Sequence, residues 1–502
     1  MILAVFILYS VLIVGVGWYV KCTSKSGGFS EFLTGGGSLG TLEVTMIAAM
    51  TSMAGGTMIS APGYTYTYGF AYALIAMMYS MNNFISLGTF GKKFAIMRRR
   101  IQAETILQLL HHRFQSRKVV ITATAVTVLF LTVNAGGQFL NAARVFSAIM
   151  GTGTYAAGLA LAVLTVLVYT MAGGVKSLSR VCVIQGMFMI AAVAFMVVAL
   201  HLEVARLHGD HAAAFAFMAR QKGALLQVRT YPWQEALGLA VVAGWANSFN
   251  PAILQVSMMY DKTKVMNRSM VSGCIIACAV YAVMTTSGVF TYTLHQSLGN
   301  ADNATLYLAT SLLPDWMAGI VFSAIFASIQ SSVSAFLLQI AGSLTRDIYK
   351  DCINPGADDE KLQRVNMALF MAFGVIAAFL ALNPTQLAQG LLILAAGGTA
   401  MGIAVPLLFG AYWKKATADG AFASCVGGVG IFTLMTLLQE MGALEGILGS
   451  VHPILPSVFV SAALMVFVSL ATQSRKVPLG IYRVWFCREY DEAYAKMYDS
   501  GR

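Results

Sequence analysis

The chain has 502 residues, of which 58% are hydrophobic and 11% charged, and it carries a net charge of +11 at pH 7 with a pI near 9.3. About a quarter of the residues of a soluble domain are charged, so this composition excludes a soluble globular protein and predicts an integral membrane protein. No polar stretch is long enough to form a soluble domain of its own.

Apolar windows of about 20 residues, each long enough to cross a bilayer as a helix, recur along the whole chain. They predict an all-α integral membrane protein with about thirteen transmembrane helices, near 2–20, 40–60, 70–90, 119–148, 156–172, 181–202, 235–259, 270–294, 317–342, 365–382, 386–410, 419–438 and 455–472. Because thirteen is an odd number, we expect the two termini on opposite sides of the membrane. The seven cysteines form no paired motif, so neither a disulfide framework nor a cysteine metal site is predicted.

Lys and Arg residues are concentrated in every second connection between these helices. With the N-terminus outside, the inner segments hold 27 of the 32 basic residues, in 21–39, 91–118, 173–180, 260–269, 343–364, 411–418 and the tail from 473. This bias follows the positive-inside rule and predicts a multi-pass protein of the cell inner (plasma) membrane, with the N-terminus outside and the C-terminus in the cytoplasm. The densest patch, GKKFAIMRRR, is interpreted as an anchor to anionic lipid of the bilayer, and no nucleic-acid partner is predicted.

Two of the predicted helices contain residues that interrupt a helix in mid-membrane. The second contains Gly55 and Gly56 in AAMTSMAGGTMISAPG, and the seventh contains Pro251 in GWANSFNPAILQ. Adjacent glycines weaken a helix and proline removes a hydrogen-bond donor, so each break leaves carbonyls without helical partners. A kink filled by neighbouring side chains explains either break alone. Each broken helix, however, is the first helix of a set of five.

Five is odd, so the two sets run in opposite directions through the membrane. Interrupted helices at matching positions of inverted halves are typical of secondary transporters, with their binding site where the halves meet. The pattern predicts a LeuT-type core with a 5+5 inverted repeat. The predicted segments are a first span with its inner loop (1–39), inverted repeat 1 (40–202), an outer loop (203–234), inverted repeat 2 (235–410), two further spans (411–472) and a cytoplasmic tail (473–502).

The ninth predicted helix gathers hydroxyl groups at its middle, in FSAIFASIQSSVSAFLLQIAGS. Ser328, Ser331 and Ser332 are three and four residues apart, so they share one side of the helix. Na⁺ exchanges its water shell for oxygen ligands, which hydroxyls and the carbonyls of a broken helix supply without a buried countercharge. Serines in such helices also bond to their own backbone or allow close helix packing, and that alternative stays open here.

The polar residues of the fourth helix give the first indication of a solute site. Asn134, Gln138 and Asn141 form one stripe at i, i+4 and i+7 on an otherwise apolar helix, either facing a cavity or bonding to another helix. Arg144, near the outer end of the same helix, is a candidate for attracting a carboxylate, with a snorkelling or gate-stabilising role as the alternative. Further candidates adjoin the two breaks, namely Ser52, Thr57, Asn247, Asn250 and Gln255.

Several longer segments resemble the sodium/solute symporter family. They are AGIVFSAIFASIQSSVSAFLLQIAGSLTRDIYK, SAPGYTYTYG, YTMAGGVKSLSRVCVIQG and PLLFGAYWKKATADGA, and the likeness extends over most of the chain. Within the family, HPILPS near the C-terminal end looks closest to the bacterial sodium/pantothenate branch. A departure lies in the seventh helix, where related symporters often have a histidine and an arginine after the proline and this chain has Ala252 and no cation.

The resemblance implies a set of ligands for the coupling ion. Na⁺ would be held by the carbonyls of Met50, Met53 and Ser328 and by the hydroxyls of Ser331 and Ser332. Some members use an aspartate and a serine for a second cation, at positions where this chain has Cys182 and Ala335. The resemblance with this departure predicts one Na⁺ per transport cycle.

The sequence therefore predicts a Na⁺-coupled symporter that imports a small organic solute by alternating access. The solute is expected to be a carboxylate such as pantothenate, with an amino acid or another monocarboxylate as the alternative. No nucleophile, paired-carboxylate site or phosphate-binding loop is found, so neither an enzyme nor an ATP-driven pump is predicted. Na⁺ is the only expected cofactor, and the solute and the lipid bilayer are the expected partners, with no obligate protein partner. The alternative hypotheses are a transporter-like membrane sensor or scaffold and a proton-coupled transporter.

Overall fold

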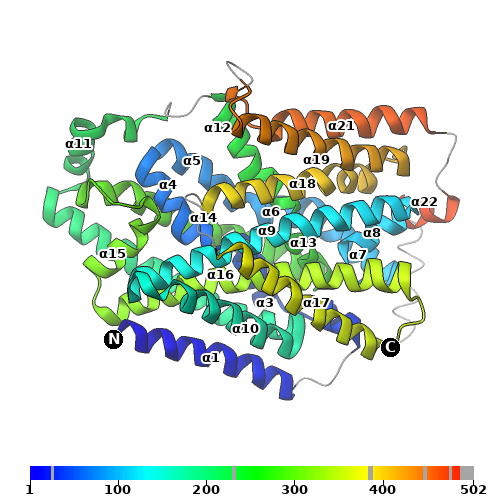
Figure 1. Ribbon diagram of the computed structural model, residues 1–502, viewed down its shortest axis with the longest axis horizontal. Coiled ribbons are helices and arrows are strands. Elements are labelled where there is room, and N and C mark those ends of the chain that lie inside the picture. The colour runs from blue at the N-terminus through cyan, green and yellow to red at the C-terminus, as the bar shows by residue number, and fades with distance from the viewer. Residues whose placement is uncertain (24–27, 229–232, 383–387, 445–448, 474–477, 487–502) are drawn as a thin grey trace.

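The computed structural model describes residues 1–23, 28–228, 233–382, 388–444, 449–473 and 478–486. Throughout these ranges the chain is helical, and the one β-type contact is an isolated bridge between Ser38 and Tyr260. Most of the long helices run along the longest axis of the molecule (Figure 1) and pack into a single bundle. The all-α class predicted from the sequence is confirmed.

The described residues form short and long helices in succession along the chain. In the first part of the chain they are α1 (Ile2–Thr23), α2 (Phe29–Thr34), α3 (Thr41–Ser52), α4 (Ala61–Tyr68), α5 (Phe70–Met77), α6 (Asn82–Ser86), α7 (Lys92–Ile101), α8 (Ile106–Phe114), α9 (Arg117–Met150), α10 (Tyr155–His208) and α11 (His211–Lys222). In the second part they are α12 (Trp233–Ala240), α13 (Pro251–Leu254), α14 (Thr263–Leu294), α15 (Ala304–Leu312), α16 (Asp315–Ser343), α17 (Asp359–Leu380), α18 (Ala388–Tyr412), α19 (Ala418–Glu440), α21 (Ile454–Ala471) and α22 (Leu479–Phe486). Short 3-10 and π-type turns join several of them, including η2 (Gly56–Ser60), η8 (Val241–Ala246), η11 (Ala301–Asn303) and η12 (Leu344–Ile353).

Among the described residues, the number of helices that could span a membrane reaches the predicted thirteen once α10 is divided. Ten of the described helices are long and apolar enough to span, and two bent helix pairs bring the number to twelve. In α10, Gly173 and Gly174 leave the helical conformation, and the Ser177 hydroxyl donates to the carbonyl of Tyr169 at 2.9 Å. Eight residues of straight helix would separate these two residues by about 12 Å. The chain therefore folds back at the glycine pair, and α10 forms the fifth and sixth spans.

Both predicted interruptions are present as sharp bends. The axis turns by 57° between Thr41–Ser52 and Gly56–Tyr68, and by 48° between Trp233–Phe249 and Pro251–Met258. The first bend lies at Met53, which has a ψ of 71°. Pro62 lies further along the chain, where η2 passes into α4, and not at the bend. The second bend lies at Asn250, which has a ψ of 124°, and Pro251 begins α13 directly after it.

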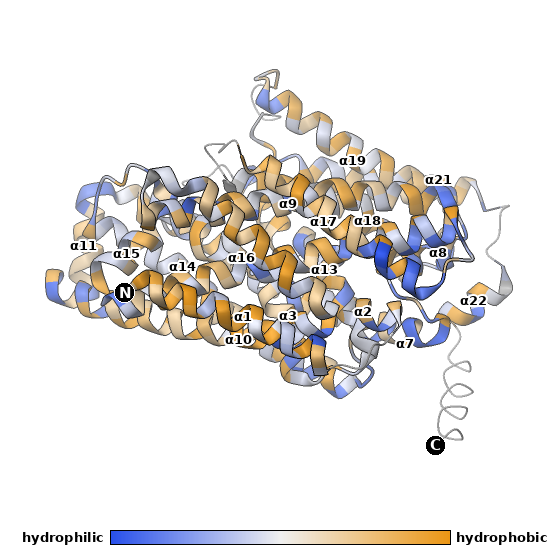
Figure 2. Ribbon diagram, turned by 60° about the horizontal axis from the view of Figure 1, so that its bottom comes forward, coloured by the Kyte–Doolittle hydropathy of each residue, from blue (hydrophilic) through white to orange (hydrophobic). Residues whose placement is uncertain are grey.

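The helices differ strongly in how much protein surrounds them. The segment Asp315–Ile353 contains α16, and 94% of its 18-residue apolar window is buried within the protein. The corresponding share for α1 is 22%. α16 packs against α1, α9 and α10. Figure 2 shows α1 and much of α10 as predominantly hydrophobic, with hydrophilic residues concentrated around α7 and α8 at one end of the bundle. α16 is thus the central helix, and α1 presents a surface suited to lipid.

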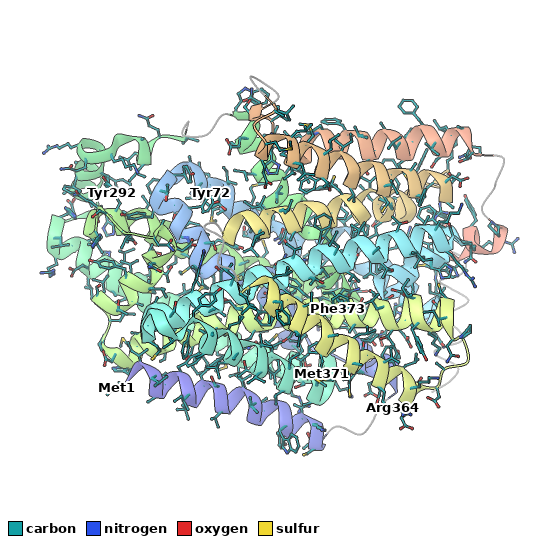
Figure 3. All side chains as sticks on the ribbon, viewed as in Figure 1. Met1, Tyr72, Tyr292, Arg364, Met371 and Phe373 are labelled. Atoms are coloured by element: carbon teal, nitrogen blue, oxygen red, sulfur yellow. The ribbon has the colours of Figure 1, made fainter. Side chains whose placement is uncertain are left out.

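The two ends of the bundle can be followed from the labelled residues of Figure 3. Met1 and Tyr292 lie toward one end, and Arg364 lies toward the other, where α22 is also found (Figures 1 and 3). Met1 and the last described helix therefore lie toward opposite ends, as an odd number of spans requires. The segment predicted as the outer loop 203–234 carries α11, whose N-terminus is capped by Asp210. Parts of this loop, of the predicted span 386–410 and of the tail 473–502 lie outside the described residues.

Candidate ion and solute site

The last turn of α3 meets the serine-rich middle of α16 directly. The carbonyl oxygen of Met50 accepts hydrogen bonds from the hydroxyls of Ser331 at 3.3 Å and Ser332 at 3.1 Å. The same two hydroxyls lie 3.0 Å from the carbonyl oxygen of Ser328, one turn earlier in α16. Four of the five oxygen ligands implied by the family resemblance therefore converge on one point.

The fifth residue, Met53, ends α3 beside this point. Its N–H donates to the carbonyl of Ala49 at 2.8 Å, and its ψ of 71° turns its own carbonyl away from the helical direction. All five residues are buried, with exposed fractions of 0%. In the described part of the chain, no three His, Cys, Asp or Glu side chains are grouped so that they could hold a metal ion. The oxygens available at this junction are therefore neutral carbonyls and hydroxyls.

The spacing of these oxygens suits a cation of the size of Na⁺. Oxygen ligands lie about 2.3–2.6 Å from Ca²⁺, which has nearly the same radius, so two ligands at a right angle are about 3.3–3.7 Å apart. The separations of 3.0 to 3.3 Å between Met50, Ser328, Ser331 and Ser332 are close to this range. An ion would replace hydroxyl-to-carbonyl hydrogen bonds with ion–oxygen contacts through a small expansion of the junction.

A small cavity adjoins the break on the side of α3 and α9. Its lining includes five of the predicted solute-site residues, namely Ser52, Thr57, Asn134, Gln138 and Asn247. The cavity volume is about 50 Å³, whereas a single water needs about 10–15 Å³. There is room for a few waters but not for an organic solute. Side chains or helices must move apart before a solute enters.

Gln138 connects the cavity with the broken helix. Its Oε1 accepts a hydrogen bond from the N–H of Gly55 at 2.9 Å, and its Nε2 lies 3.4 Å from Oδ1 of Asn134. A Cβ at position 55 would lie 2.8 Å from Gln138 Oε1 and 2.5 Å from Ile329, so only glycine permits this approach. One amide therefore supports the break and faces the cavity.

Aromatic residues that the sequence does not single out also line the cavity. The Thr57 hydroxyl donates to the Tyr281 hydroxyl at 2.7 Å, and the ring of Tyr281 stacks on Tyr79 with centroids 5.6 Å apart. Both tyrosines and Phe336 line the cavity. Aromatic residues are frequent in membrane helices, so no local pattern distinguishes these three from lipid-facing ones.

Arg144 is not among the lining residues of this cavity. Its guanidinium pairs with the carboxylate of Asp302 at 3.1 Å, and η11, which carries Asp302, packs against α4. Burial raises the pKa of the Asp302 carboxyl, and the positive charge of Arg144 partly offsets this rise. The pair joins the C-terminal end of α9 to the connection between α14 and α16. Asn141, three residues before Arg144, is fully buried and does not line the cavity either.

Asn250 and Gln255, predicted beside the second break, bond to backbone away from this cavity. Asn250 caps α13 by accepting the N–H of Ala252 at 2.9 Å. The Gln255 Nε2 donates to the carbonyl of Glu104 at 2.7 Å, and its Oε1 accepts the N–H of Ile106 at 3.2 Å. Gln255 thereby fastens the seventh span to the α7–α8 connection.

The same connection is fastened to the end of the ninth span. Arg346 forms ion pairs with Glu104 and Asp351, each at 2.7 Å, and the Thr105 hydroxyl donates to Asp347 at 2.7 Å. Burial raises the pKa of the Glu104 carboxyl, and Arg346 partly offsets this rise. These contacts and the Gln255 bonds join helices at one end of the bundle, whereas the pair of Arg144 with Asp302 lies at the other.

Near Ala335, where the resemblance led us to expect no ligand for a second cation, the structure has a neutral hydrogen-bond network. Ser334, next to Ala335, lies 2.5 Å from the Tyr169 hydroxyl and 2.8 Å from the Thr170 hydroxyl, and it donates to the carbonyl of Gln330 at 2.8 Å. Cys182 is fully buried and brings no carboxylate to this region. The hydrogen bonds of Ser334 are thus satisfied within the protein.

Comparisons with known proteins agree with this architecture. The family model described as "Sodium:solute symporter family" matches residues 32–428. The sodium/pantothenate symporter of Escherichia coli K12 is 27% identical over 464 residues, covering 90% of this chain and 93% of that protein. The sodium/proline symporter of the same organism is 26% identical over 455 residues, covering 87% and 88%. A solved structure of a substrate-bound, outward-open Na⁺-coupled sialic acid symporter has a TM-score of 0.75 at 19% identity, covering 95% of this chain and 98% of that chain, which confirms the predicted fold.

Proposed function

The chain belongs to the sodium:solute symporter family and is a Na⁺-coupled solute symporter, and on this premise we propose that it imports pantothenate, or a similar small carboxylate, together with one Na⁺. The observation that carries the proposal is the convergence of Met50, Ser328, Ser331 and Ser332 beside a cavity that begins at the same helix break. The similarity to the sodium/pantothenate symporter of Escherichia coli supports the choice of solute.

Coupling follows from the shared helix break. Na⁺ bound between α3 and α16 holds the break in one geometry, and Gln138 and Ser52 connect that geometry with the solute cavity. Each ligand therefore strengthens binding of the other by the same factor. Alternating access follows when the contacts of Gln255 with Glu104 and of Arg144 with Asp302 open in turn. We propose that the end carrying α7 and α8 is cytoplasmic, because basic residues are concentrated there.

A carboxylate solute needs a positive partner, and no Lys, Arg or His is among the described residues that line the cavity. We propose that Na⁺ and the N-terminal end of the helix Gly56–Tyr68 supply this positive charge. An amino acid such as proline also carries a carboxylate, and the sodium/proline symporter of Escherichia coli is nearly as similar. Proline is therefore the second candidate solute.

Uptake of labelled solute into proteoliposomes tests the function. An inward Na⁺ gradient is expected to drive accumulation of pantothenate, because Na⁺ completes the solute site, and choline in place of Na⁺ at fixed pH is expected to abolish it. Unlabelled proline in excess serves as a competitor. Na⁺-driven accumulation of labelled proline, but not of labelled pantothenate, would replace the first candidate with the second. Accumulation driven equally by a pH gradient without Na⁺ would contradict Na⁺ coupling, and no accumulation of any solute would favour a sensor.

The number of ions per cycle is expected to be one, since Cys182 and Ala335 supply no ligand for a second cation. With pantothenate, which carries one negative charge, transport is then electroneutral, and an imposed membrane potential leaves uptake unchanged. A second Na⁺ would add a net charge and about 2.3 kcal/mol of driving force per 100 mV. The measurement is uptake at fixed Na⁺ gradient with and without a valinomycin-clamped K⁺ potential. Faster uptake of pantothenate at negative internal potential would contradict the single-ion stoichiometry.

A further inference from the structure

A second cavity, of about 460 Å³, lies where the N-terminal ends of α9 and α19 meet. It is lined mainly by residues 113–118, which lead from α8 into α9, and by residues 417–419, which begin α19. None of its lining residues belongs to the solute cavity. Sites for small molecules have volumes of about 300–1,000 Å³, so this cavity is large enough for a ligand of metabolite size.

The wall of this cavity carries more positive than negative charge. Among the described residues that line it, Arg113, Arg117 and Lys118 are cations, and Asp419 is the one acid. Arg117 and Lys118 are exposed in the first turn of α9. An anion that enters the cavity therefore meets cations on the side of α9.

Arg113 is a buried cation in this wall, and one of its donor groups has no partner. It is 1% exposed, and burial lowers the pKa of its guanidinium to about 10, so it stays charged at neutral pH. Its Nε donates to the carbonyl of Gly410 at 2.8 Å, and its Nη2 donates to those of Trp413 at 3.2 Å and Ala416 at 3.4 Å. Nε and Nη2 form one edge of the planar guanidinium, so Nη1 points away from these carbonyls. Among the described residues Nη1 has no hydrogen-bond partner, which is costly for a buried donor unless a ligand or water accepts from it.

The first turn of α9 adds backbone donors to the same cavity. The amide groups of residues 117–119 come before the first helical hydrogen bond, which runs from the N–H of Val120 to the carbonyl of Ser116. Ser116, at the N-cap, makes no side-chain capping bond. The dipole of this 34-residue helix also favours a negative charge at its N-terminal end. A buried guanidinium and a helix N-terminus therefore offer donors to one ligand.

We propose that this cavity binds the phosphate group of a soluble phosphorylated metabolite of the cytoplasm. A phosphate monoester carries nearly two negative charges at neutral pH and has three strong acceptor oxygens, which suit both a guanidinium and a helix N-terminus. Arg113 binds the phosphate from the buried side, and Arg117 and Lys118 bind it from the solvent side. The cytoplasmic location follows from the concentration of hydrophilic, basic residues around α7 and α8 in Figure 2.

The walls suit a soluble ligand better than a lipid headgroup. Gln115, Ser116 and Thr417 are polar, and Phe114 is the one aromatic residue among the described residues that line the cavity. A headgroup site at the membrane interface is typically accompanied by Trp or Tyr, and it needs an apolar wall for the acyl chains. The volume leaves room beside the phosphate for an organic part such as a sugar, whose hydroxyls the polar side chains can bind.

A ligand at this place would join helices on which the solute cavity depends. Asn134 and Gln138 of α9 and Leu392 of α18 line the solute cavity. The bonds of Arg113 reach the C-terminal end of α18. A phosphate that holds α9 against α18 and α19 opposes the movement that must enlarge the solute cavity. We therefore expect the bound metabolite to slow uptake.

Binding to the purified full chain in neutral detergent tests the site. Titration calorimetry and the melting temperature are followed with glucose 6-phosphate and inorganic phosphate as probes and glucose as the uncharged counterpart. The two phosphates are expected to bind, and glucose is not. Arg117→Gln combined with Lys118→Gln, both at exposed positions, is expected to weaken phosphate binding about tenfold or more, because each lost group bonds to a full charge. Equal affinity of this variant and the wild type, or no binding of either phosphate to the wild type, would overturn the proposal.

The matched control is Lys262→Gln combined with Lys264→Gln. Both lysines are exposed at the N-terminal end of α14, another long helix without a side-chain cap, and neither lines the cavity. This variant loses the same charge and is expected to bind glucose 6-phosphate as the wild type does. An equal loss of affinity in the two double variants would reveal general attraction to surface cations and would overturn the proposal.

Arg113→Lys tests the buried side of the site, since it keeps the charge and replaces the planar fork by a single ammonium. It is expected to bind both phosphates more weakly than the wild type, with Na⁺-driven uptake as the check on folding. Unchanged phosphate affinity in a folded Arg113→Lys protein would overturn the role of Arg113. If this variant does not fold, the Arg117 and Lys118 variant decides alone.

Two further measurements separate a soluble ligand from a lipid and connect the site with transport. Phosphatidylglycerol retained by the wild type, lost in the Arg117 and Lys118 variant and not displaced by glucose 6-phosphate would assign the cavity to lipid and overturn the proposal. Glucose 6-phosphate on both faces of proteoliposomes is expected to slow Na⁺-driven uptake by the wild type and not by that variant. An unchanged rate at saturating glucose 6-phosphate would overturn the link to transport.

Discussion

Replacing both Ser331 and Ser332 by alanine is expected to raise the Na⁺ concentration for half-maximal uptake by about a hundredfold or more. The two hydroxyls are half of the converging oxygens, and each lies between the carbonyls of Met50 and Ser328. A hydrogen-bonding group that faces a full charge contributes about 1.5–3 kcal/mol, so loss of two such groups costs at least about 3 kcal/mol, and each 1.4 kcal/mol is tenfold in affinity. The measurement is solute uptake into proteoliposomes over a series of Na⁺ concentrations at constant ionic strength.

The matched control removes two hydroxyls from the same helix away from the break. Ser323 bonds to its own helix through the carbonyl of Gly319, and Ser343 accepts a bond from Gln339 one turn earlier. Both are fully buried, as Ser331 and Ser332 are. Ser323→Ala combined with Ser343→Ala is expected to keep the Na⁺ activation curve of the wild type. If the two double variants give the same curve, or the Ser331 and Ser332 variant keeps normal Na⁺ activation, the ion site lies elsewhere.

The substitution Gln138→Leu is expected to weaken solute and Na⁺ binding together, each by about tenfold or more. Leucine has a similar volume but cannot accept the N–H of Gly55, so a buried donor at the break loses its partner at a cost of about 1–3 kcal/mol. The same change removes an amide from the cavity. The two affinities are measured separately, with Na⁺ binding in the absence of solute followed by thermal stabilisation and solute binding followed by uptake.

Asn247→Ala is the comparison for Gln138→Leu, because Asn247 lines the same cavity but belongs to the second broken helix, Trp233–Phe249. Its loss is expected to weaken solute binding and to leave Na⁺ binding without solute unchanged. A Gln138→Leu protein with normal Na⁺ binding would contradict the link between the amide and the break. Unchanged solute affinity in both variants would exclude this cavity as the solute site.

Features that depend on local chemistry were predictable from the sequence. The bends at Met53 and Asn250 follow from glycine and proline in apolar surroundings, and the convergence at α16 follows from serines spaced three and four residues apart. The inverted arrangement followed from the odd number of helices in each half. These predictions succeeded because a membrane interior leaves few ways to satisfy a free carbonyl or hydroxyl.

The residues that the sequence could not place are those whose side chains have two equally good roles. Arg144 and Gln255 are polar groups near the ends of spans, and each is satisfied by a partner far away in the chain, Asp302 and the backbone at Glu104. An amide or guanidinium gives the same local pattern whether it faces a solute or holds two helices together. No sequence pattern indicates that Tyr79 and Tyr281 stack, because the two rings come from different halves of the chain.

The small volume of the cavity at the broken helix has a consequence for any equilibrium binding measurement. About 50 Å³ cannot hold an organic molecule, so with the solute site proposed at this cavity only the fraction of molecules in an expanded conformation takes up the solute. The apparent dissociation constant is then the intrinsic constant divided by that fraction. An antibody fragment or a substitution that favours the expanded conformation would raise apparent affinity without adding a single contact to the solute.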